Sequence, residues 1–181
     1  MLKSAYSFAT KKEKIENHII VVWVDNESGV LARVVGLFSG RGYNIDSLAV
    51  AEVDKRKNIS RITIATSGTT QVLQQIKLQL GKLVPVHKVA DFPSNKKTLM
   101  REMALLKIVS TSSQLKKAKK LCKKYKFTVL DQTSRSFICE VSALKKDIDG
   151  LIKKLQPLGL ASASRTGVVA MTKGSEIYQQ N

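Results

Sequence analysis

Strand and helix patterns follow one another in the same order twice along this chain. In the first copy, β-branched runs alternate with apolar residues at helical spacing, and polar or glycine-containing turns separate them. Gly81 ends the second helix, and DKRKN joins the two middle strands as a hairpin loop would. The predicted elements of this copy are a strand at 18–24, a helix at 29–40, strands at 43–53 and 59–66, a helix at 70–80 and a strand at 83–91.

The second copy begins after FPSNKK, a linker that contains proline and lysine. Its predicted elements are a strand at 100–110, a helix at 113–125, strands at 126–133 and 136–143, a helix at 145–156 and a strand at 160–171. We therefore predict an α+β fold of two tandem ferredoxin-like βαββαβ domains. The predicted divisions are a flexible N-terminal extension at 1–17, a first domain at 18–93, a linker at 94–98, a second domain at 99–172 and a C-terminal tail at 173–181.

In the first strand, IIVVWV, the residues that point to either face of the sheet are apolar. A ferredoxin-like sheet carries both helices on one face, so alternating polar residues would be expected if its other face met water. The pattern therefore predicts that something covers the open face. A second copy of the chain, its own C-terminal domain and a foreign protein all remain possible covers at this point.

The net charge of +17 favours an acidic partner as a hypothesis, and most of the excess is C-terminal. Residues 1–92 carry 13 basic and 8 acidic side chains, whereas 93–181 carry 18 and 6. The densest segment, LKKAKKLCKKYK, places its apolar residues on one side of a helix and its lysines on the other. Because it has no arginine and no interleaved exposed aromatic, a solvated lysine face is favoured over a nucleic-acid site.

The first strand passes into the first helix through the polar turn DNESG. Asn26 or Ser28 could cap the amides at the helix start, and Gly29 leaves room there. Free amides in the first turn, together with the helix dipole, favour a small anion. A phosphate fits poorly, since GxxxxGK[ST] and GxGxxG are missing and Asp25 and Glu27 would repel it.

An amino acid fits this turn better than a phosphate does. Its carboxylate could accept from the amides, its ammonium could face Asn side chains or backbone carbonyls, and an aliphatic side chain could lie among Val30, Leu31 and Ile45. The competing interpretation is a plain capped turn that binds nothing. The turn by itself favours that plainer interpretation.

No motif in the sequence predicts catalysis or a metal site. His18 and His87 have no Cys or carboxylate at ligand spacing, and GxSxG, HExxH and paired-carboxylate motifs are missing. Cys122 and Cys139 lack metal-ligand or CxxC spacing, so we predict buried thiols. No apolar run approaches the ~20 residues of a membrane span. The expected location is a soluble reducing compartment, either a cytoplasm or a plastid stroma.

The sequence DNESGVLARVVGLFSGRGYNIDSLAV, followed by SRITIAT, resembles the ACT domain of the regulatory (small) subunit of acetohydroxyacid synthase, also called acetolactate synthase. The resemblance extends from residue 18 to about residue 172, because REMALLKI, QPLGL and SRTGVVAM look like the C-terminal domain of that family. The lysine-rich helix and LDQTSRSFICEVSALKKDI depart from the usual glycine- and acid-bearing hairpin of the family.

The resemblance implies a non-catalytic subunit that stimulates a catalytic large subunit and confers feedback inhibition by valine or a related branched-chain amino acid. The large subunit would hold thiamine diphosphate, magnesium and FAD, and this chain would hold no cofactor. A homodimer would form through the ACT domain, with the edge strand from Tyr43 pairing with its twin. The ligand contacts implied are Asn26, Gly29, Val30 and Leu31 of one chain and Asn44 and Ile45 of the neighbouring chain.

Two other classes of function compete with this one. A basic RNA-binding protein would need aromatics in the middle of the open-face strands, but the matching strand SRITIAT has none. A free-standing amino-acid sensor would control another enzyme or a transcription factor, and a pull-down would identify its different partner. We therefore expect neither nucleic acid nor a membrane among the partners.

Overall fold

The computed structural model describes residues 14–93 and 97–175. The first unit consists of β1 (Glu16–Asp25), α1 (Val30–Ser39), β2 (Ser47–Asp54), β3 (Ile59–Gly68), α2 (Thr70–Leu80) and β4 (Val86–Pro93). The second consists of β5 (Thr98–Val109), α3 (Ser112–Cys122), β6 (Phe127–Gln132), β7 (Ser136–Ala143), α4 (Lys145–Leu155), a 3-10 turn (Gln156–Leu158) and β8 (Leu160–Thr172).

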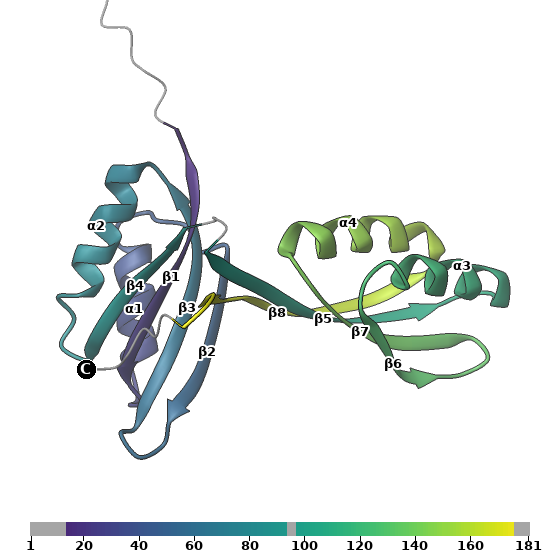
Figure 1. Ribbon diagram of the computed structural model, residues 1–181, viewed down its shortest axis with the longest axis horizontal. Coiled ribbons are helices and arrows are strands. Elements are labelled where there is room, and N and C mark those ends of the chain that lie inside the picture. The colour runs from purple at the N-terminus through teal and green to yellow at the C-terminus, as the bar shows by residue number, and fades with distance from the viewer. Residues whose placement is uncertain (1–13, 94–96, 176–181) are drawn as a thin grey trace, which may run out of the picture.

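Each unit forms one antiparallel sheet, with strand order β2-β3-β1-β4 in the first and β6-β7-β5-β8 in the second. Both helices of a unit lie on the same side of its sheet (Figure 1). The predicted βαββαβ order is confirmed in both copies. The first helix-side core consists of Ile20, Val22, Val24, Val30, Val34, Leu37, Phe38, Ile62, Ile64, Leu73, Ile76 and Leu80.

The opposite face of the first sheet is also buried, as the apolar pattern of β1 predicts. Ile19, Val21 and Trp23 point away from the helices and pack with Val168 and Ala170 of β8. The guanidinium of Arg61 lies 5.5 Å from the centre of the Trp23 ring and donates to the carbonyl of Ala170. Among the three possible covers, the structure therefore identifies the C-terminal half of the same chain.

A long two-stranded ribbon of β5 and β8 joins the two units (Figure 1). Its register shifts between Glu102 and Ala104, where the side chain of Thr166 accepts a hydrogen bond from the Met103 amide at 3.2 Å. The segment of β8 after this bulge lies over the first sheet. Gly167 at the bulge has φ +79, and an added Cβ would lie 3.3 Å from Ser47. The bulge is thus the point at which the ribbon passes from one sheet to the other.

Several predicted boundaries are wrong by a few residues. The strand predicted from Tyr43 begins at Ser47, because Tyr43 instead donates its amide to the carbonyl of Phe38 at 3.0 Å and closes the end of α1. The strand predicted at 83–91 is β4, which runs from Val86 to Pro93. The lysine-rich helix ends at Cys122 rather than at residue 125. Strand β1 begins two residues before its predicted start. Residues 1–13 of the predicted extension and 176–181 of the predicted tail lie outside the described residues.

The lysine-rich helix has the predicted amphipathic form. Leu115, Ala118 and Cys122 of α3 are buried, while its lysines are exposed except Lys119, which is partly buried. The Cys122 and Cys139 thiols are both buried, as predicted, and their sulfur atoms lie 4.0 Å apart. Within residues 14–93 and 97–175, no helix is long and apolar enough to cross a membrane.

Candidate functional site

The turn between β1 and α1 places Gly29 at the N-cap position with φ +83 and ψ −9. This left-handed conformation is costly for most residues with a Cβ, which explains glycine at this position. Neither Asn26 nor Ser28 caps the helix, so that prediction is wrong. The side-chain oxygen of Asn26 instead accepts a hydrogen bond from Ser60 Oγ at 3.0 Å, which ties the turn to β3.

The amides at the start of α1 are only partly satisfied. Val30 N–H makes a long hydrogen bond of 3.4 Å to the carbonyl of Glu27, and Arg33 N–H donates to that of Gly29 at 3.0 Å. In the described part of the chain, no acceptor pairs with the amides of Leu31 and Ala32. The Leu31 side chain is 40% exposed. The first turn of α1 therefore presents free donors toward solvent at the positive end of the helix dipole.

Two charged groups border this turn. Asp25 lies 2.6 Å from Nε2 of His87, so one carboxylate already has a partner. Glu27 is exposed, and the first turn of α1 contains no acidic residue. An anion at the free amides would thus meet less repulsion than the sequence DNESG suggests.

The other predicted site residues precede β2. The side chain of Asn44 donates to Asp46 Oδ1 at 2.6 Å, and its carbonyl accepts from Thr66 Oγ1 at 2.6 Å. Ile45 is half-buried against the helix-side core. The side chain of Val30 is only 4% exposed and belongs to the same core, so its backbone is the part that remains open.

One copy of the chain does not bring the two groups of predicted residues together. Asn26 is bonded to Ser60 near the start of β3, whereas Asn44 is bonded to Thr66 near its end. Six residues of an antiparallel strand span about 20 Å. A site that includes both groups needs a second copy of the chain. Strand β2, at the edge of the first sheet, exposes Val50 and Val53 at 45% and 49%.

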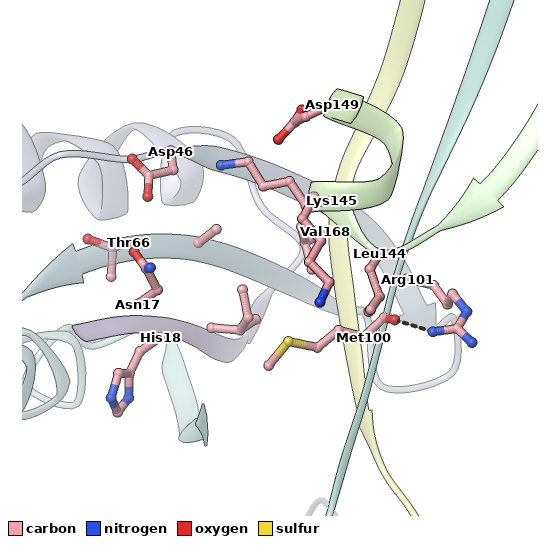
Figure 2. Close-up of a pocket in the computed structure, with 13 residues that line it drawn as sticks. Asn17, His18, Asp46, Thr66, Met100, Arg101, Leu144, Lys145, Asp149 and Val168 are labelled. Carbon is pink, nitrogen blue, oxygen red and sulfur yellow. Dashed lines mark hydrogen bonds between the residues drawn. The ribbon is translucent and has the colours of Figure 1, made fainter. Parts of the chain in front are cut away.

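A cavity that no sequence pattern predicted lies between the two units (Figure 2). The cavity has a volume of about 440 Å³ and is lined by residues from β1, β3, β5, α4 and β8. None of the six predicted contact residues lines it. Its lining comes from segments far apart in the chain, so no local motif could have predicted it.

An ion-pair network lies beside this cavity. Arg165 of β8 donates to both oxygens of the buried Glu102 at 2.6 and 2.8 Å and to Asp149 of α4 at 2.6 Å. The hydrogen bonds with Glu102 are the main cause of the raised pKa of Arg165. On the first sheet, burial lowers the pKa of the Arg61 guanidinium. These two arginines hold the ribbon against both units.

The two βαββαβ units in one chain define a tandem-domain protein of the ACT-like fold. Sequence comparison matches residues 20–88 to the family described as AHAS small subunit-like ACT domain and residues 101–174 to that described as small subunit of acetolactate synthase. The chain therefore belongs to the acetolactate synthase small-subunit family. This membership supports the prediction of a non-catalytic regulatory subunit of acetolactate synthase.

Individual relatives agree with this assignment. The chain is 35% identical to the acetolactate synthase small subunit of Aquifex aeolicus over 94% of this chain and 88% of the relative. It is 34% identical to the acetolactate synthase isozyme 3 small subunit of Escherichia coli over 89% and 98% of the two chains. The crystal structure of the Thermotoga maritima small subunit superimposes with a TM-score of 0.80 at 29% identity, covering 88% of this chain and 99% of that one.

Proposed function

We propose that this chain stimulates the thiamine-diphosphate-dependent catalytic subunit of acetolactate synthase and makes it sensitive to feedback inhibition by valine. The observation that carries the ligand part is the start of α1. There the amides of Leu31 and Ala32 have no acceptor among the described residues, and the left-handed Gly29 keeps the approach open. Family membership supports the catalytic large subunit as the partner.

In the proposed site, the carboxylate of valine accepts hydrogen bonds from the first-turn amides of α1. The aliphatic side chain of valine lies against Leu31 of the same chain and Ile45 of the second copy. The ammonium faces Asn44 of the second copy, whose side-chain oxygen can accept from it because its Nδ2 already donates to Asp46. Asn26 holds the turn in place through Ser60.

The second copy is proposed to pair along β2. This strand lies at the edge of the first sheet, and its exposed valines indicate a surface that a partner strand can cover. Pairing of two such edges would bring residues 44 and 45 of one copy toward the α1 turn of the other. The large subunit, and not this chain, is proposed to hold thiamine diphosphate, magnesium and FAD.

The test is reconstitution of the full chain with its large subunit. The chain alone should form no acetolactate, the mixture should turn over faster than the large subunit alone, and valine should reverse the increase. Leucine and isoleucine, tested in parallel, identify the preferred amino acid. Turnover by the isolated chain, or an unchanged rate of the large subunit, contradicts the proposal. Capture of a different enzyme in a pull-down favours the free-standing sensor.

A further inference from the structure

The cavity between the two units has an apolar floor. Ile19 and Ala65 contribute from the first sheet, and Met100 and Val168 contribute from the ribbon that covers it. Its volume of about 440 Å³ lies within the range of pockets that bind small molecules. The floor is continuous with the core between the first sheet and β8. Packing of that core therefore holds the cavity in shape.

The rim of the cavity is charged, and its acidic groups already have donors. Asp46 accepts from the Asn44 side chain at 2.6 Å, and Asp149 accepts from Arg165 at 2.6 Å. Lys145 and Lys146, the first two residues of α4, have no carboxylate within 4.0 Å in the part of the chain that the structure describes. Lys145 extends across the cavity toward Asp46 without reaching it (Figure 2). The rim groups that remain available to bind a ligand are therefore the positively charged side chains of Lys145 and Lys146.

We propose that this cavity binds a small organic carboxylate, with its charge held by Lys145 and Lys146 and a short branched apolar body against the floor. An inorganic phosphate would leave the apolar floor unused. An amino acid would bring an ammonium group to a rim whose carboxylates are already paired. The site goes beyond the proposed valine site and shares none of its six residues.

Binding here would act on the arrangement of the two units. The cavity is lined by both of them, close to the bulge at Met103 where the ribbon passes from one sheet to the other. A carboxylate held by α4 with its apolar body on the first sheet contacts both sides at once. Binding therefore favours the arrangement in which β8 covers the first sheet over any arrangement that separates the two units.

The experiment uses the ¹⁵N-labelled full chain and pivalate, a branched carboxylate, followed by amide chemical shifts. Pivalamide is the matched uncharged probe, and inorganic phosphate is the matched anion without an apolar body. The test variant is Lys145→Gln with Lys146→Gln. The control is Lys153→Gln with Lys154→Gln, which removes the same charge from the exposed last turn of the same helix.

Pivalate is expected to shift amides on both sides of the cavity, and pivalamide is not. The dissociation constant should rise at least tenfold in the test variant and stay within twofold in the control, because charge-assisted hydrogen bonds are lost only in the first. The proposal is overturned if pivalate shifts no cavity amide, if phosphate acts as well as pivalate, or if both variants weaken binding equally. A valine titration of the same variants measures binding at the start of α1 separately. A failure of the cavity proposal is therefore distinguishable from a failure of the proposed valine site.

Discussion

Replacing Gly29 by Asp tests the proposed valine site at the N-cap position of α1. An added Cβ would meet no atom within 4 Å, so the cost to folding comes only from the left-handed backbone. Aspartate tolerates this conformation better than most residues, and we expect a loss of about 1 kcal/mol. The sequence alone gave no reason to expect this loss, because it does not reveal the positive φ.

The added carboxylate acts on the ligand. A charge about 4 Å from the valine carboxylate costs ~1 kcal/mol in bulk water and ~4 kcal/mol at an effective dielectric constant near 20. The expected loss of valine affinity thus lies between about fivefold and roughly a thousandfold, and a site closed by a second copy is nearer the upper figure. Stimulation of the large subunit should survive while valine inhibition disappears.

Gly29→Asn is the matched control, since asparagine has nearly the same shape and similar tolerance of this backbone but carries no charge. Acetolactate formation by the reconstituted complex is measured against valine concentration, and thermal unfolding confirms that both variants are folded. Each should lose a few degrees of melting temperature. The reasoning is refuted if Gly29→Asp stimulates its partner and remains as valine-sensitive as the parent. Equal loss in the Asn variant would assign the effect to shape and not to charge.

Asn26→Ala removes the hydrogen bond from Ser60 and should weaken valine binding by about 1 kcal/mol, measured by calorimetry; an unchanged affinity would remove Asn26 from the site. Arg61→Met removes the guanidinium from the Trp23 ring and the Ala170 carbonyl, and should cost about 1 kcal/mol of stability without changing valine affinity. A fragment that ends at residue 95 should still dimerise and bind valine but regulate poorly. It should also melt below the full chain, because it uncovers the face that β8 covers; a fragment without valine binding would show that the site needs the second unit.

The order of the elements was predictable because it depends on local periodicity. The apolar residues of α4 recur at helical spacing, and both parities of β1 are apolar, so the helix and the burial of both sheet faces follow from neighbouring residues. The cover itself was not predictable, since Val168 and Ala170 meet β1 from the far end of the sequence.

The candidate site was predictable only in part. A glycine before an apolar helix indicated the turn, but not that Gly29 itself would occupy the N-cap position. Asn26 and Ser28 have the residue types that cap helices, and the side chain of Asn26 is used by Ser60 instead. Lys145 and Asp46 line one cavity although about a hundred residues separate them, and no pattern in the sequence connects them.

The strand that covers the first sheet is synthesised well after that sheet. The first sheet is complete in sequence at residue 93, whereas its cover begins near Val168, some 75 residues later. At about 5–20 residues per second, roughly 4 to 15 s of synthesis separate the two events. During that interval Trp23 and its neighbours face solvent uncovered. The newborn first unit is therefore an expected client for chaperones that recognise apolar surface, and slow translation of the second unit should lower the yield of folded protein.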